Sequence, residues 1–457
     1  MELLALVPDR EARVPLAAQL ADALRTAARA GALRVGERLP STRSLATDLG
    51  VSRTVTAAAY DQLLAEGWVA GRRGAGTFVV AVPPGPGAGA DVVADVAAVV
   101  GSPAPPTVDL RAGTPCVAAL DRAAWRRAWR AAGDEPPDVV SDAVGLPAFR
   151  GAVAAHLLRH RGLPAELDTV VATSGTTAAV AELARALPPG AHVAVEEPGY
   201  QRAVGALRSA RLVVVPVPVD RDGLVVEELP AGLAAVYCTP AHQFPLGARL
   251  SAARRVALVA RARVEGFLVV EDDYDGELRY DVAPLPLLAA LGPDVVAHLG
   301  TASKLLTPTL GVGWLVAPPA LRAAVVAQRD RAGVRPARAG QRVFAALAAH
   351  GDLGRHLRRL RRELSARRRM VVAAVAAAGR SVQGDAAGAH VVVALDSRAT
   401  EEAVLAATAE CGVAVDGLAR HHAGPPGAAG IVLGYAGPSR ADLERALPVV
   451  TAALRAL

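Results

Sequence analysis

The sequence predicts a multidomain chain in which a small α+β unit precedes an α/β domain. The length of 457 residues is too great for one ordinary core. Residues 15–79 carry apolar side chains at helical spacing and end in a basic hairpin, whereas from Asp109 onward short Val/Leu/Ala runs alternate with Ala/Arg-rich helices. A stretch rich in Pro, Gly and Ala lies between them. We therefore expect a first domain over 1–80, a linker over 81–108 and a second domain over 109–457, with a small C-terminal subdomain from about 330.

Composition narrows the range of functions. The formal net charge of +6 permits a nucleic-acid partner without requiring one. The three cysteines, Cys116, Cys238 and Cys411, are scattered and lack CxxC spacing, which argues against a disulfide framework or a zinc site and fits a reducing compartment. No apolar run reaches bilayer length. We expect a cytoplasmic protein with no membrane partner and no metal.

The small unit begins with three predicted helices. Leu16, Leu20 and Leu24 recur at helical spacing in the first. Ser41 is a candidate N-cap of the second helix and Ser52 of the third, and a glycine turn separates the two. Two short helices joined in this way are typical of a helix-turn-helix.

Two short strands around a basic glycine turn follow, at about 68–80, as in a wing that lies on a phosphate backbone. Ser52, Arg53, Thr54 and Thr56 are expected to face outward from the start of the third helix, where base edges would lie. The alternative is a three-helix protein-interaction domain. The excess of arginine over acids in this unit is modest but has the sign that DNA binding needs.

The segments LPSTRSLATDLGVSRTV, AYDQLLAEGW and GRRGAGTFV closely resemble the GntR-type winged helix. The resemblance implies that the arginine of the first segment, the start of the recognition helix and the wing contact double-stranded operator DNA. Carried over to this chain, those residues are Arg43, Ser52, Arg53, Thr54, Thr56, Gly74 and Thr77.

In the second domain, strands are predicted at 170–172, 192–195, 234–238, 267–270 and 299–301. The first strand ends at TSGTT, a small-residue turn that opens a helix and presents N–H groups and hydroxyls suited to phosphate. The fourth ends at EDDYD, whose carboxylates are expected at the carboxyl edge of the sheet, where open α/β sheets bind ligands. The alternative for this cluster is a solvated turn.

Lys304 follows the last of these strands and is the only lysine among 50 lysine and arginine residues. Arginine can replace lysine in surface ion pairs and against DNA phosphates. It cannot replace lysine in covalent bonding to a carbonyl, because the guanidinium stays protonated and is not nucleophilic. Lys304 is therefore a candidate covalent anchor for a carbonyl cofactor, and the alternative is a loop lysine without a role.

A phosphate-type turn, a carboxylate–tyrosine pair and a lone lysine are the groups that pyridoxal 5′-phosphate requires. The motifs TSGTT, EEPGY, TPAHQFPLG, EDDYDGE and GTASK make residues 109–457 resemble a fold-type I aminotransferase domain, an α/β fold dependent on this cofactor. The order of winged helix, linker and aminotransferase-like domain resembles the MocR subfamily of GntR regulators. That resemblance implies a homodimer in which the winged helix of one subunit packs on the large domain of the other.

The same resemblance implies a role for each site residue. Lys304 would hold the cofactor covalently and act as the catalytic residue. Asp272 would pair with the pyridine nitrogen, and Tyr274 would donate to the ring hydroxyl. Tyr200 would stack on the ring, the alternative being an ordinary core tyrosine. Gly175, Thr176 and Thr301 would hold the phosphate, while His242 and Gln243 would line the site.

Three positions depart from the family pattern. Gly311 stands where an arginine usually grips the cofactor phosphate, and Val432 stands where an arginine usually pairs with the amino-acid carboxylate. At Val140 the segment lacks the tyrosine that normally reaches the phosphate of the neighbouring subunit. A charge-assisted hydrogen bond is worth roughly 1.5–3 kcal/mol, so each loss weakens binding on the order of tenfold to a hundredfold.

We therefore expect a DNA-binding transcription regulator whose aminotransferase-like domain binds pyridoxal phosphate loosely on Lys304. That domain would sense a small-molecule amine or the cofactor itself and would transaminate ordinary amino acids poorly. Two alternatives remain open: an active PLP-dependent aminotransferase, and a cofactor-free DNA-binding protein with a scaffold domain.

Overall fold

The computed structural model describes residues 9–10, 12–72, 76–82, 107–136, 139, 142–280 and 285–457. The chain divides into two compact units, Met1–Pro105 and Pro106–Leu457, which we describe separately. The predicted linker lies largely outside the described residues. In the described part of the chain no helix has the length and apolar character needed to cross a membrane.

The first unit is a helix-turn-helix followed by a hairpin. Its helices are α1 (Leu16–Arg29), α2 (Thr42–Asp48) and α3 (Arg53–Ala65), and its strands are β1 (Val69–Arg72) and β2 (Gly76–Val79). The two predicted caps are confirmed, because the Ser41 hydroxyl accepts from the Ser44 N–H at 3.0 Å and the Ser52 hydroxyl from the Val55 N–H at 3.4 Å. A small apolar core centred on Leu20, Leu45 and Leu63 holds the three helices together.

The second unit is built on an eight-stranded sheet with the order β4-β11-β10-β9-β8-β5-β6-β7. All five predicted strands are confirmed, and only β11 and the edge strand β7 run antiparallel to the rest. In sheet order the bounds are β4 (Val170–Thr173), β11 (Gly313–Val316), β10 (Val296–Thr301), β9 (Leu268–Asp273), β8 (Leu233–Cys238), β5 (His192–Glu197), β6 (Val213–Asp220) and β7 (Gly223–Leu224).

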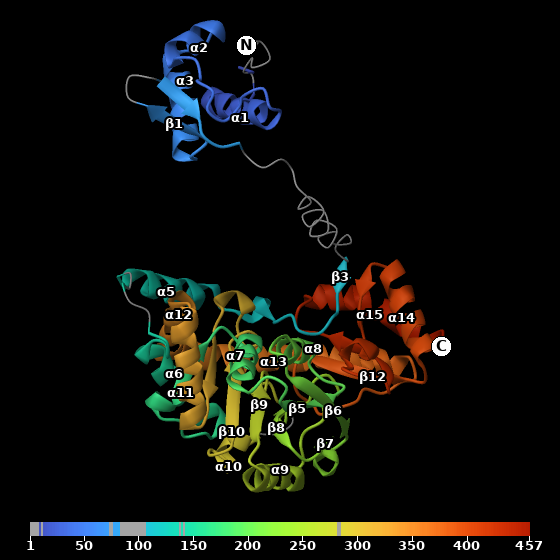
Figure 1. Cartoon of the computed structure of the whole chain (residues 1–457). Helices are drawn as coiled ribbons and strands as arrows, with labels where there is room; N and C mark the ends of the chain where they lie inside the picture. Colours follow the sequence, from blue (N-terminus) through green and yellow to red (C-terminus); the bar gives the residue numbers. More distant parts are fainter. Residues whose placement is uncertain are drawn as a thin grey trace. The chain divides into compact units, whose positions relative to one another are not determined.

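Helices cover both faces of this sheet (Figure 1). Successive strand residues point to opposite faces, and the strands are apolar at successive positions, so both faces have to be buried. Val171 packs with α7 (Thr176–Ala186), α8 (Gln201–Ser209) and α11 (Pro319–Ala332). Its neighbours Val170 and Ala172 belong to the core on the other face. That face is covered by α6 (Pro147–Arg161), α9 (Ala252–Glu265), α10 (Leu288–Leu291) and α12 (Arg338–Ala349), with α5 (Arg122–Asp134) packed on α12.

The small subdomain is predicted from about residue 330, and this boundary stays a prediction, although α12 in that range packs on α5 and α6 of the large part. It contains the long helix α13 (Asp352–Ala377) and a three-stranded sheet with the order β12-β15-β14. The further bounds are β12 (His390–Leu395), α14 (Arg398–Glu410), β13 (Val413–Ala414), β14 (Asp416–Gly417), β15 (Ala429–Gly434) and α15 (Arg440–Arg455). The strand β3 (Val108–Asp109), from the start of the unit, pairs in parallel with β13.

Candidate functional sites

The start of α3 presents a polar surface in the first unit. Arg53 and Thr54 are exposed, as is Arg43 on the preceding helix. Ser52 is exposed as well, but its hydroxyl already caps the helix. These residues agree with a surface that can meet a DNA backbone and base edges.

Thr56 does not belong to this surface, so the expectation that it faces outward is wrong. Its side chain is fully buried, and its hydroxyl donates to the Thr42 carbonyl at 2.8 Å. The position one turn into α3 points toward α2, so Thr56 fixes the angle of the helix pair. Thr77 is half-buried in β2, and Gly74 lies outside the described residues.

We expect Arg53→Ala to weaken binding to a non-specific DNA duplex several-fold and to reduce the salt slope of binding by about one, because one phosphate-neutralising charge is lost. Thr56→Val is the matched control on the same helix. It should lower the thermal midpoint while leaving the salt slope unchanged. Fluorescence anisotropy titrations at several salt concentrations measure both, and equal slopes for wild type and Arg53→Ala would remove Arg53 from the interface.

In the second unit a cavity of about 530 Å³ opens at the carboxyl ends of the parallel strands. It brings together residues from segments between Ala112 and His421 that are distant in the sequence. Its wall includes the predicted residues Gly175, Thr176, Tyr200, Asp272, Tyr274, Thr301 and Lys304.

Lys304 is half-buried at the end of β10, and its Nζ donates to the Gly113 carbonyl oxygen at 2.5 Å. Burial lowers the pKa of Lys304, and the nearby charge of Arg202 lowers it further, against the opposing effect of Asp275 and Asp272. A lowered pKa increases the fraction of neutral amine, which is the form that can attack a carbonyl carbon.

Asp272 is buried at the same edge of the sheet. One carboxylate oxygen accepts a hydrogen bond from the Tyr237 hydroxyl at 2.6 Å, and the other has no partner among the described residues. Burial raises the pKa of Asp272 to about 7, although the Tyr237 bond acts in the opposite direction. A buried carboxylate oxygen that faces a cavity without a partner is suited to a cationic N–H group of a ligand.

The turn before α7 forms a phosphate-type site. Gly175 occupies the N-cap position with φ 117°, and its side-chain-free Cα leaves the first N–H groups of α7 without a capping side chain. A Cβ at Gly175 would lie 3.6 Å from the Thr301 hydroxyl, so Thr301 lies next to this end of the helix. The hydroxyl residues on this part of the wall are Ser174, Thr176, Thr177, Thr301 and Ser303.

The tyrosines take different positions. Tyr200 is half-buried on the wall, with its hydroxyl 3.0 Å from the Thr177 hydroxyl, and its stacking role stays a prediction. Tyr274 also lines the cavity, but its hydroxyl donates to the His242 carbonyl at 3.0 Å, so in this structure its proton is not directed at the ligand space.

His242 and Gln243 are not on the cavity wall, contrary to expectation. His242 is buried and forms a 2.9 Å contact with Asp275. Gln243 donates to the Pro198 carbonyl at 2.8 Å and so ties two neighbouring loops together. Phe244 and Thr239 of the same loop line the cavity instead.

The carboxylates of the EDDYDGE segment are not a solvated turn. Strand β9 continues through Asp273, and all five acids of the segment are buried and have a polar contact, namely Glu271, Asp272, Asp273, Asp275 and Glu277. Glu271 accepts from two N–H groups of α10, Asp273 pairs with Arg161, and Glu277 pairs with His156. These partners come from distant helices, and no signal in the sequence identified them.

The positions that depart from the family pattern lie away from the wall. Val432 is fully buried in β15 against Val392 and Leu418, and Gly311 occupies a left-handed turn with φ 58°. Val140 is outside the described residues. Two arginines that the sequence analysis missed, Arg202 and Arg420, line the cavity instead. The location of Arg202, two residues after Tyr200 at a strand end, was the one available signal.

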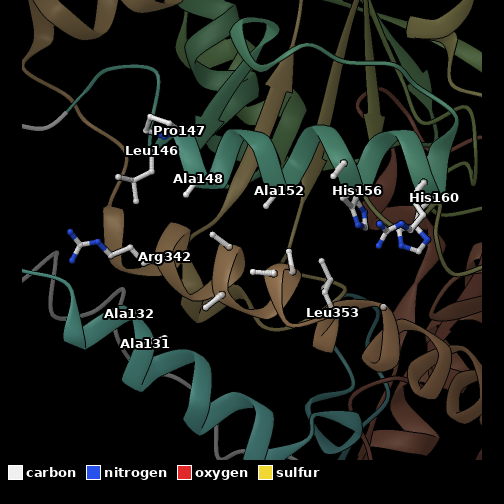
Figure 2. Close-up of a pocket in the computed structure, with 18 of the residues that line it drawn as sticks. Ala131, Ala132, Leu146, Pro147, Ala148, Ala152, His156, His160, Arg342 and Leu353 are labelled. Atoms are coloured by element: carbon white, nitrogen blue, oxygen red, sulfur yellow. The ribbon is translucent and has the colours of Figure 1, made fainter.

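A larger cavity of about 920 Å³ lies between α5, α6, α12 and the start of α13. Figure 2 shows Ala148 and Ala152 of α6 facing it, with His156 and His160 at one end and Arg342 at the other. None of the predicted site residues lines it, and alanine is the commonest lining residue. Within the described residues no cluster of His, Cys, Asp or Glu is arranged to bind a metal ion.

Both units of the chain match known protein families. Residues 16–79 match the bacterial regulatory proteins of the gntR family, and residues 106–450 match aminotransferase class I and II. The chain is similar to the HTH-type pyridoxine biosynthesis transcriptional regulator PdxR of Corynebacterium glutamicum, with 36% identity over 94% of each chain. It is also similar to the probable rhizopine catabolism regulatory protein MocR of Rhizobium meliloti, with 33% identity over 99% of this chain and 96% of that one.

Solved structures show the same fold for the second unit. An archaeal alanine:glyoxylate aminotransferase superposes with a TM-score of 0.72 at 24% identity, covering 80% of this chain and 95% of that chain. The kynurenine aminotransferase of Pyrococcus horikoshii gives a TM-score of 0.71 at 24% identity, covering 80% and 94%.

Proposed function

Because the chain belongs to the MocR subfamily of GntR-type transcriptional regulators, in which a winged helix-turn-helix precedes an aminotransferase-like domain, we propose that its large domain binds pyridoxal 5′-phosphate on Lys304 as a ligand sensor. The protein is a DNA-binding regulator. The proposal concerns what the second unit contributes to that role.

The observation that carries the proposal is the partnerless buried oxygen of Asp272 in the same cavity as Lys304 and the open N-terminus of α7. These three groups fit the pyridinium N–H, the aldehyde and the phosphate of the cofactor. The cofactor supplies an electrophilic carbonyl carbon when bound. Asp272 would hold the ring-nitrogen proton, Lys304 would provide the nucleophilic amine, and Thr176 with its neighbours would bind the phosphate.

Two features support sensing in preference to turnover. By the family resemblance, Val432 stands where aminotransferases have the arginine that pairs with the amino-acid carboxylate, and this valine is buried, so an amino-acid substrate would lack its usual partner at that position. The relative from Corynebacterium glutamicum is named as a regulator of pyridoxine biosynthesis. We therefore favour the cofactor itself as the signal, with an amine that competes for it as the second candidate, and a homodimer as the functional form.

The test is the absorption spectrum of the full chain with added pyridoxal phosphate. Wild type should absorb visible light, because an aldehyde joined to the Lys304 amine absorbs at longer wavelengths than protein. Lys304→Ala and Lys304→Arg should both lose this band, and the arginine variant controls for loss of positive charge. A colourless wild-type protein in excess cofactor would contradict the proposal. Rapid turnover of an amino acid by the coloured protein would favour the aminotransferase alternative instead.

A further inference from the structure

The residues that follow the linker form one wall of the cavity. We call residues 107–115 the entry segment, because it is the first described part of the second unit after residues 83–106, which lead from the DNA-binding unit. Ala112, Gly113, Thr114 and Pro115 line the cavity beside Lys304.

The entry segment is attached to the small subdomain by backbone hydrogen bonds. The Leu110 N–H donates to the Ala414 carbonyl at 2.8 Å, and the Leu110 carbonyl accepts from the Gly434 N–H at 2.6 Å. A Cβ at Gly434 would lie 2.6 Å from the Arg111 carbonyl oxygen, so the two backbones are in direct contact. Any movement of the entry segment relative to β13 and β15 therefore has to break these backbone hydrogen bonds.

Two further bonds attach the segment to groups at the cavity. The Ala112 N–H donates to the buried carboxylate of Asp416 at 3.3 Å. The Gly113 carbonyl oxygen accepts from the Lys304 ammonium at 2.5 Å. Of the two bonds, only the one between Gly113 and Lys304 connects the entry segment to the large sheet, because Lys304 follows strand β10.

We propose that Gly113 and a carbonyl ligand compete for the Lys304 nitrogen, so that ligand occupancy loosens the entry segment. The inference rests on the proposed function. When Lys304 condenses with an aldehyde, its ammonium first gives one proton to solvent. The two remaining N–H hydrogens leave with the aldehyde oxygen as water, and a carbon–nitrogen double bond forms.

After condensation the Lys304 nitrogen is held at the carbonyl carbon and carries at most one proton, whereas the ammonium had three and could rotate toward Gly113. The Gly113 carbonyl then loses a charged donor, which makes local opening of the entry segment about tenfold more frequent. A ligand shifts an equilibrium only through a difference in its interactions with the two states, and here that difference is the loss of one named bond.

Hydrogen–deuterium exchange of the full chain, followed in the peptide that contains 107–115, tests the inference with two variants. Lys304→Met can neither donate nor condense, and without ligand it should exchange about tenfold faster than wild type. Lys304→Arg keeps N–H donors but cannot condense, and it should stay near wild type. Added pyridoxal phosphate should accelerate exchange in wild type only. A peptide from α9 serves as the internal reference for global stability.

The absorption spectrum of the same samples separates the two proposals. If wild type binds the cofactor and its entry segment exchanges at an unchanged rate, competition for Lys304 is overturned and the cofactor site stands. If the 107–115 peptide exchanges at the same rate in wild type, Lys304→Met and Lys304→Arg without ligand, the bond between Lys304 and Gly113 does not hold the entry segment closed. That result also overturns the inference. If wild type remains colourless, the proposed function itself fails.

Discussion

Replacing Arg161 with Met is expected to lower the free energy of unfolding of the large domain by about 3–5 kcal/mol. Arg161 ends α6 and is buried, and its guanidinium forms two 2.7 Å bonds with the Asp273 carboxylate. Burial alone would lower the pKa of Arg161, and the Asp273 charge holds it above its usual value. Without the guanidinium, Asp273 remains as an uncompensated charge in the core.

Denaturant unfolding of the full chain, followed by tryptophan fluorescence, measures the loss. The double variant Arg161→Met with Asp273→Asn should recover more than half of it, because the stranded charge is gone. Arg263→Met provides the matched control, since Arg263 makes the same two-bond contact with Asp294 on an exposed surface. Solvent screens that pair, so its loss should have little effect. Similar losses for Arg161 and Arg263 would refute the argument from burial.

Local patterns in the sequence predicted the parts of this molecule that depend on neighbouring residues. The caps at Ser41 and Ser52 and the five strands depend on spacings of two to four residues, and the structure contains each of them. The small-residue turn at Gly175 and the isolated Lys304 were recognisable because chemistry limits which residues can replace them.

The failures share a different physical origin. Thr56 was expected to face outward because it is polar, but a buried threonine hydroxyl is satisfied by a carbonyl of the neighbouring helix. The alternative of a solvated turn stayed open for the EDDYD acids, because a partner such as Arg161 lies more than a hundred residues from Asp273. Single-sequence periodicity contains no information about such pairs, and the contribution of Arg420 to the cavity wall was missed for the same reason.

Between about pH 4.5 and 7, Glu196 is expected to make the large domain less stable as the pH rises. It is buried near the end of β5, where the Thr239 hydroxyl donates to one carboxylate oxygen at 2.5 Å and the Thr239 N–H to the other at 3.1 Å. Burial raises the pKa of Glu196 to about 7 despite these bonds. The folded state therefore binds the proton more tightly than the unfolded state does, so stability from this group is present below the unfolded pKa and is lost as the pH rises through the folded pKa.

The full effect of this shift corresponds to about 3 kcal/mol between the two pH limits. Glu196→Gln keeps the shape of the side chain and cannot ionise, so its free energy of unfolding should vary less with pH than that of wild type, the difference growing toward pH 7. Glu363 provides a control of opposite sign, because hydrogen bonds from Arg440 and Arg367 lower its pKa to about 2 and its effect falls at more acidic pH. Denaturant midpoints for wild type, Glu196→Gln and Glu363→Gln at pH 5, 6 and 7 separate the two groups. If the denaturant midpoints of wild type and Glu196→Gln change with pH in parallel, the prediction is wrong. In that case the Thr239 hydrogen bonds lower the pKa of Glu196 by as much as burial raises it, and Glu196 stays ionised over this pH range.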